Sequence, residues 1–239
     1  MAFTCQKVRM TLLRRVRKEG NDAHAARQAD VGAIAPDWLF DACGDETARL
    51  LLRIDEALER RTARIVQFIA AGADEGTSSI AWAYARASAA MLQRQILLLS
   101  DAPASHQDDR AAAESGDDAG AFPQLAQSFG DGLSVAPLLS GSKAQQGLHT
   151  RMLHQPFWHQ LRQHYDEVVI DSPALSVSPL GRFIAAHADA VVIVVEAEKT
   201  RSPVARQLIE DLHAVRANII GSVLNKRRFY VPRSIYNRL

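Results

Sequence analysis

The sequence of 239 residues contains no run of about 18 apolar residues, so it does not predict a transmembrane helix. It has only two cysteines, Cys5 and Cys43, which fit neither a disulfide framework nor a metal cluster. Positive and negative charges are nearly balanced, with 28 Lys and Arg against 27 Asp and Glu. The net charge of +1 therefore indicates no nucleic-acid partner. The basic N-terminus predicts no signal peptide. We therefore expect a cytoplasmic protein whose contact with a membrane is at most peripheral, at the inner face of the cell membrane.

The hydrophobic content of 47% supports one sizeable core. Residues 1–45 mix basic residues and alanines around a short apolar cluster, which we interpret as a basic, weakly ordered N-terminal arm. Residues 46–239 are predicted to form one α/β domain. Within it, residues 102–120 are polar and indicate a mobile loop, and the C-terminal tail is basic with interleaved aromatic residues.

Five apolar runs rich in β-branched residues predict strands that are buried on both faces, at 65–69, 96–99, 168–170, 191–195 and 219–224. Helical patterns lie between and before them, at 46–61, 80–92, 157–164 and 203–215. Alternation of such strands with helices favours a mainly parallel β-sheet flanked by helices on both faces, as in P-loop NTPases.

Residues 65–79, IVQFIAAGADEGTSS, have the outline of a phosphate-binding loop between a strand and a helix. Backbone N–H groups in such a turn, together with the start of the helix, attract an anion. Ser78 stands at the position of the hydroxyl that binds Mg²⁺, and Thr77 occupies the position of the lysine. The candidate nucleotide-binding residues are Gly72, Gly76, Thr77, Ser78 and Ser79.

Asp101 and Asp171 each follow a predicted strand, and ligands of doubly wound sheets bind beyond the carboxyl ends of the strands. Asp171 is therefore a candidate Mg²⁺ ligand with Ser78, and Asp101 a candidate catalytic residue that positions a water or a hydroxyl. The alternative is that both aspartates begin loops or cap helices.

The missing lysine lowers the expected activity. A lysine contact with phosphate contributes roughly 1.5–3 kcal/mol, and loss of one such electrostatic group slows catalysis on the order of a hundredfold or more. Thr77 carries a hydroxyl and no positive charge. We therefore expect weak binding of ATP and Mg²⁺ and impaired catalysis.

The order of these motifs resembles the bacterial tyrosine kinase (BY-kinase) domain of the MinD/ParA-like P-loop ATPases. The resemblance rests on the loop, on YDEVVIDSP at 165–173, on ADAVVIVV at 188–195 and on GSVLN at 221–225. It implies that Asp171 is the Walker B aspartate, that Asp101 begins the second Walker motif and that Asn225 lies near adenine. The family serves capsule and exopolysaccharide export, and its membrane co-polymerase can be a separate chain.

Several positions depart from the family pattern. Pro103 and Ser105 replace later residues of the second Walker motif, and Thr77 replaces the loop lysine. The family's oligomerisation motif, Glu-x-x-Arg-x-x-Arg, is retained only in part. Its remnants are the candidate interface residues Glu46, Arg49 and, one place late, Arg53. The tail carries Tyr230 and Tyr236 as candidate phosphoacceptors, where the family has a dense tyrosine cluster.

These observations lead to one main hypothesis and two alternatives. The main hypothesis is a kinase-like, catalytically impaired, homo-oligomeric partner of a membrane polysaccharide co-polymerase that regulates exopolysaccharide biosynthesis or export. The first alternative is an active ATPase or tyrosine autokinase with a variant loop. The second is a MinD/ParA-like protein that acts at the membrane through its basic ends.

Overall fold

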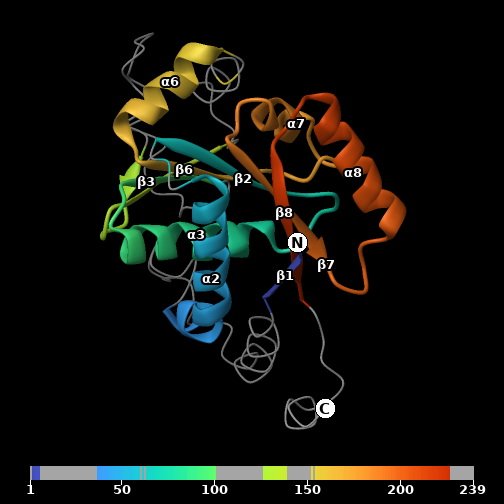
Figure 1. Ribbon diagram of the computed structural model, residues 1–239, viewed down its shortest axis with the longest axis horizontal. Helices are drawn as coiled ribbons and strands as arrows, with labels where there is room; N and C mark the ends of the chain where they lie inside the picture. The colour runs from blue at the N-terminus through green and yellow to red at the C-terminus, as the bar shows by residue number, and fades with distance from the viewer. Residues whose placement is uncertain are drawn as a thin grey trace, which may run out of the picture.

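The computed structural model describes residues 2–5, 37–59, 61, 63–100, 126–138, 152 and 154–226. Helices cover a central sheet in this part of the chain (Figure 1). In chain order the elements are β1 (Ala2–Cys5), α2 (Asp37–Ala57), β2 (Arg64–Ala70), α3 (Thr77–Leu92), β3 (Ile96–Leu99), β4 (Gln127–Ser128), β5 (Leu133–Ala136), α6 (Gln155–His164), β6 (Glu167–Asp171), α7 (Leu180–Ala185), β7 (Ala190–Glu196), α8 (Ser202–Ala214) and β8 (Ile219–Asn225).

The eight strands form one sheet in the order β1-β8-β7-β2-β6-β3-β5-β4. Every neighbouring pair is parallel except β4 and β5, which form an antiparallel hairpin. The five predicted strands are confirmed as β2, β3, β6, β7 and β8, and they are consecutive neighbours in the sheet. The predicted class, a mainly parallel sheet flanked by helices as in P-loop NTPases, is therefore confirmed.

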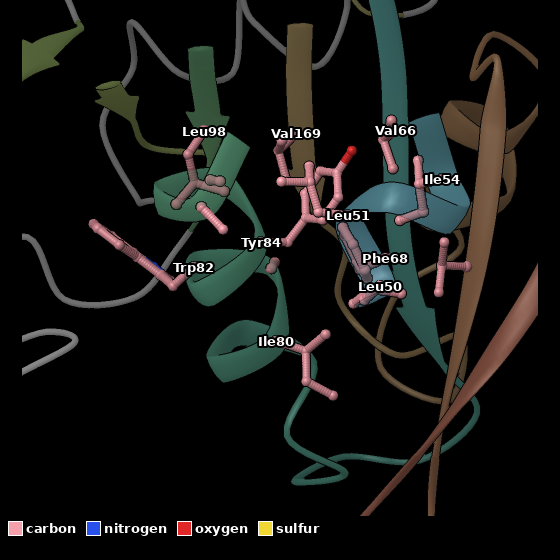
Figure 2. Packing of buried hydrophobic residues seen from close by; sticks show 14 of the residues in the cluster. Leu50, Leu51, Ile54, Val66, Phe68, Ile80, Trp82, Tyr84, Leu98 and Val169 are labelled. Carbon is pink, nitrogen blue, oxygen red and sulfur yellow. The ribbon is translucent and has the colours of Figure 1, made fainter. Parts of the chain in front are cut away.

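Helices cover both faces of the sheet. On one face α2 and α3 pack over alternate residues of the central strands, among them Val66, Phe68 and Val169, as Figure 2 shows. On the other face α6 and α7 cover the neighbours of those residues, such as Ile65 and Val168, and α8 extends this layer over β7. Strands buried on both faces need the continuous apolar runs seen in the sequence.

Helix α2 is longer than predicted. It begins at Asp37, so the boundary expected at residue 45 falls inside the helix. The helix includes Gly44. It tolerates this residue, because one glycine destabilises a helix by only about 1 kcal/mol and the other residues of α2 outweigh that cost. β1, which pairs with β8, also lies in the stretch interpreted as a weakly ordered arm. Strand β1 and its partner β8 are more than 200 residues apart in the sequence, so the four residues of β1 alone do not indicate that they pair.

The apolar stripe of α2 faces the protein's own core. Leu50, Ile54 and Leu58 are buried, and α2 packs mainly on α3. Arg49 and Arg53 are exposed on the helix, and Glu46 is half-buried. The stripe therefore contributes to the fold. The positions of α2 that another chain can reach are mainly polar, and Leu52, at 59% exposure, is the large apolar exception.

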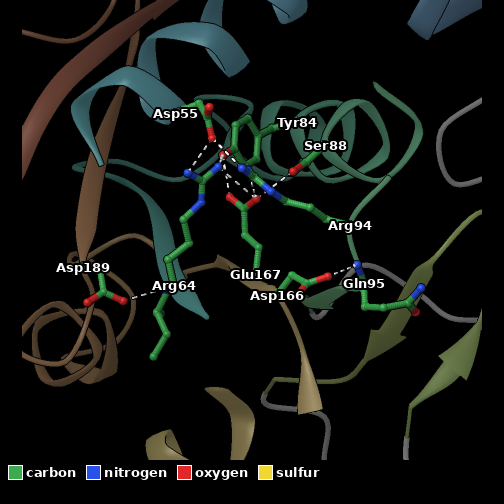
Figure 3. A network of polar contacts seen from close by, with 10 residues as sticks. Asp55, Arg64, Tyr84, Ser88, Arg94, Gln95, Asp166, Glu167 and Asp189 are labelled. Atoms are coloured by element: carbon green, nitrogen blue, oxygen red, sulfur yellow. Dashed lines mark hydrogen bonds and ion pairs between the residues drawn. The ribbon is translucent and has the colours of Figure 1, made fainter. Parts of the chain in front are cut away.

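A buried polar network joins α2, α3, β2 and β6 (Figure 3). Its centre is the carboxylate of Glu167, which is fully buried. It accepts hydrogen bonds from the Tyr84 hydroxyl (2.5 Å), the Ser88 hydroxyl (2.6 Å) and the Arg64 guanidinium (3.1 Å). Burial beside Glu167 raises the pKa of Tyr84 well above its usual value, so this hydroxyl stays a donor. A buried carboxylate needs such partners, because an unpaired charge would be costly.

Asp55 connects this network to α2. Its Oδ1 accepts hydrogen bonds from Arg64 (2.9 Å) and Arg94 (2.7 Å). Burial alone would raise the pKa of Asp55, but these two hydrogen bonds outweigh burial and hold the pKa below its ordinary value of 3.8. The ionised carboxylate therefore stabilises the fold above that pH, and its contribution is lost as the pH falls through the lowered pKa.

Removing the charge at the centre of the network should destabilise the protein. We expect Glu167→Gln to lower the free energy of unfolding by about 3–5 kcal/mol, because the buried Arg64 and its neighbour Arg94 would be left to share the carboxylate of Asp55. Urea unfolding measures this loss. As a control, Glu59→Gln removes an exposed pair with Arg61 and should change stability by about 0–1 kcal/mol. A loss at Glu167 no larger than that of the control would contradict the central role of this carboxylate.

Candidate functional site

The predicted phosphate-binding loop lies between β2 and α3, at the carboxyl edge of the parallel sheet. Two of its residues have positive φ angles, Asp74 at 62° and Gly76 at 89°. Gly76 caps the N-terminus of α3. A Cβ atom at this position would lie 2.1 Å from Nδ2 of Asn225, so the strand β8 approaches the loop too closely for any side chain. Glycine is required here both for its φ angle and for this contact.

Glu75 turns its carboxylate into the protein and is only 5% exposed. Oε1 accepts a hydrogen bond from the Gly72 amide (3.0 Å), and Oε2 accepts one from the Glu196 amide at the end of β7 (3.3 Å). The loop glutamate therefore ties the beginning of its own loop to the neighbouring strand.

The end of β8 holds the same loop. The Asn225 side-chain amide donates to the Glu75 carbonyl (2.8 Å). The Lys226 ammonium donates to the Asp74 carbonyl and to the Glu196 carboxylate. Burial alone would raise the pKa of Glu196, but hydrogen bonds from Lys226 and Lys199 outweigh burial and lower the pKa. Glu196 is therefore ionised at neutral pH.

The first turn of α3 offers backbone groups to an anion. The first amides of an α-helix have no acceptor within the helix, and Gly76 has no side chain to provide one. Thr77 begins the helix and is half-buried, while Ser78 and Ser79 are exposed. This end of α3 thus presents amides and hydroxyls, and position 77 contributes no positive charge.

Asp171 ends β6, the strand beside β2. Its carboxylate is 7% exposed, and Oδ2 accepts a hydrogen bond from the Ser100 hydroxyl (2.7 Å) at the end of β3. The ends of β2, β6 and β3 are therefore neighbours, as predicted. Asp101, the residue after Ser100, lies outside the described residues, as do the loop at 102–120 and the tail tyrosines Tyr230 and Tyr236.

The structure brings some predicted residues together and adds others. Gly72, Gly76 and Asn225 meet around Glu75, and Asp171 lies on the adjoining strand. The sequence reasoning did not assign roles to Ser100, Glu196 or Lys226. Two of these had a signal, because Ser100 directly precedes Asp101 and Lys226 directly follows Asn225, at the ends of predicted strands.

Comparison with solved structures places this fold among known proteins. The kinase domain of the Escherichia coli tyrosine kinase ETK is 17% identical, with a TM-score of 0.71 over 96% of this chain and 92% of that chain. The BceF tyrosine kinase domain is 15% identical, with a TM-score of 0.60 over 94% and 91%. MinD from Pyrococcus horikoshii, solved with Mg-ADP, is 13% identical, with a TM-score of 0.52 over 73% and 76%.

The protein therefore has a P-loop NTPase-like fold. More narrowly, it has the fold of a bacterial tyrosine kinase domain, as the sequence motifs indicated. No family model matches the sequence, and no curated protein matches it either. In the part of the chain that the structure describes, no helix has the length and apolar character needed to cross a membrane.

The residues present fit part of the ligand that this fold implies, ATP with Mg²⁺. The first turn of α3 suits phosphate oxygens, and Ser78 and Asp171 would supply oxygen ligands of the kind that Mg²⁺ prefers. Such a ligand would supply the γ-phosphoryl group for transfer. Position 77 carries a threonine where the phosphate-binding loop has a lysine. The site therefore lacks the positive charge that this lysine would bring to the phosphates.

The close approach of β8 to the loop can be tested with two glycines of similar φ. We expect Gly130→Ala, at a φ of 80° with open space around it, to cost about 1–2 kcal/mol from backbone strain alone. Gly76→Ala should cost clearly more, because its Cβ would also displace the Asn225 amide. Urea unfolding of both variants compares them, and equal losses would show that β8 does not press on the loop.

Proposed function

We propose that the protein is a kinase-like, catalytically impaired partner of a membrane polysaccharide co-polymerase, with a regulatory role in exopolysaccharide biosynthesis or export. The single observation that carries this proposal is a tyrosine-kinase fold whose phosphate loop starts its helix with Thr77. The fold supplies the surfaces of a kinase domain, while the loop lacks the charge that phosphoryl transfer needs.

Three of the departures from the kinase pattern concern phosphoryl transfer. The loop lysine, the later part of the second Walker motif and the tyrosine-rich tail are each altered. The contacts that shape the loop, by contrast, are in place: Gly76 against Asn225, and Glu75 against Gly72. Residues for phosphoryl transfer are altered while the contacts that shape the phosphate loop are retained, and this combination supports a role in binding and regulation.

The nucleotide part of the proposal is tested by restoring the charge. We expect Thr77→Lys to tighten ATP binding by about 1.5–3 kcal/mol, because an ammonium would reach the phosphates. Titration calorimetry with Mg·ATP measures this change. Thr77→Met is the matched control, since it has a similarly long side chain without the charge, and it should leave affinity low.

Tight Mg·ATP binding by the natural chain, abolished by Asp171→Ala, would contradict impaired nucleotide binding. It would favour the first alternative, an active ATPase or autokinase. Radiolabelled ATP then identifies the activity, because an autokinase incorporates label at Tyr230 or Tyr236. The second alternative, a MinD/ParA-like positioning protein, requires nucleotide-dependent sedimentation with anionic liposomes.

We also propose that the protein self-associates through α2. Arg49 and Arg53 are exposed on this helix, whose apolar stripe already packs on the core. In this proposal the two arginines contact acidic groups of a second copy or of the co-polymerase. This part of the proposal concerns assembly only and does not depend on nucleotide.

Charge reversal tests the role of α2 in assembly. We expect Arg49→Glu with Arg53→Glu to lower the assembled mass in light scattering and to leave the thermal midpoint nearly unchanged, because exposed charges contribute little to stability. The matched control reverses two exposed arginines at α8, Arg201 directly before the helix and Arg206 within it, as Arg201→Glu with Arg206→Glu, at the same change in net charge. An unaltered mass, or an equal loss of mass in the control, would exclude α2 as the interface.

A further inference from the structure

The phosphate loop is held in place by protein atoms from β7 and β8. The Glu75 carboxylate bridges the Gly72 amide and the Glu196 amide. On the outer side, the Asn225 side-chain amide donates to the Glu75 carbonyl. These bonds engage the backbone of the loop at both its ends, so they determine its shape whatever side chain stands at position 77.

Lys226 adds the only ammonium that contacts this loop among the described residues. Its Nζ donates to the Asp74 carbonyl and forms an ion pair with Oε2 of Glu196 at 2.9 Å. The Lys226 side chain is 13% exposed, so its pairing is little screened by solvent. Its own amide donates to Oδ1 of Asn225 (2.8 Å), which fixes the lysine relative to the residue that also holds the loop.

Lys199 provides an internal comparison. Its ammonium forms an ion pair with the same Oε2 atom of Glu196 at 3.2 Å, but its side chain is 61% exposed. Lys199 thus shares the carboxylate with Lys226. Unlike Lys226, it donates no hydrogen bond to the backbone of the loop among the described residues. Any effect that comes merely from neutralising Glu196 is expected at both lysines, whereas an effect through the Asp74 carbonyl is expected at Lys226 alone.

From these contacts we propose that Lys226 is a positioning residue that latches the phosphate loop onto the ends of β7 and β8. The latch supplies a positive charge beside a loop that has none at position 77. It keeps the Glu75 carboxylate between the Gly72 and Glu196 amides and so holds the loop in one conformation. The inference concerns the conformation of the loop and not its activity, so it holds or fails independently of the proposed function.

Hydrogen exchange followed by mass spectrometry tests the latch in the full chain without ligand. The Gly72 amide is the direct reporter, because it donates to the Glu75 carboxylate. The Glu196 amide is a second reporter, and it is shared between the Glu75 carboxylate (3.3 Å) and the Thr200 hydroxyl (3.1 Å). Local opening of a segment sets the exchange rate of its protected amides. We expect Lys226→Met to accelerate exchange at both amides on the order of tenfold, since a hydrogen bond from a charged group is lost.

Three comparisons make the outcome decisive. Lys199→Met should leave both amides near their natural rates, and Lys226→Arg should restore part of the protection because it keeps the charge. Amides in the centre of β2 and β6 should be unchanged in every variant, which separates loosening of the loop from loss of the fold. The latch is excluded if Lys226→Met leaves Gly72 and Glu196 unchanged, if Lys199→Met accelerates them equally, or if the central strands exchange faster to the same extent.

Discussion

The buried carboxylate of Glu167 is the constraint on which the arrangement of this domain depends. It lies at the start of β6 with no exposed surface, and a charge in that position requires hydrogen-bond donors on several sides. Two donors come from α3, Tyr84 and Ser88, and a third, Arg64, comes from β2. The carboxylate thereby sets where α3 lies along the sheet, a quantity that apolar packing alone leaves less well determined.

The position of the phosphate loop follows from that of α3. The helix has 16 residues and is therefore about 24 Å long. Tyr84 and Ser88 anchor its middle and far part to Glu167, and its first turn begins directly after the loop at Gly76. Because the helix is rigid, these contacts with Glu167 also determine where its N-terminus lies. The polar network at the amino edge of the strands and the candidate site at their carboxyl edge are thus connected through one element.

The elements that could be predicted from the sequence are those whose signal is local. Continuous apolar runs gave β2, β3, β6, β7 and β8, and the helical pattern between them gave α3, α6 and α8. The strand β1 and the pairing of Arg64 with Glu167 were not predicted, because each depends on partners far away in the chain, 103 residues apart in the second case. The first nine residues of α2 were not predicted either. The direction of the Glu75 carboxylate depends on a distant partner too, because it accepts a hydrogen bond from the Glu196 amide, 121 residues further along the chain.

The loop separates two properties that a phosphate-binding motif usually combines. Its shape comes from Gly76, which lets Asn225 approach, and from the bonds of Glu75 and Lys226 to backbone atoms. Its charge toward a phosphate would come from position 77, whose side chain takes no part in those bonds. A lysine there can therefore be replaced by Thr77 without loss of the loop's conformation or of the packing of α3. The shape of the loop and the charge at position 77 can therefore change separately, because these two features rest on different residues.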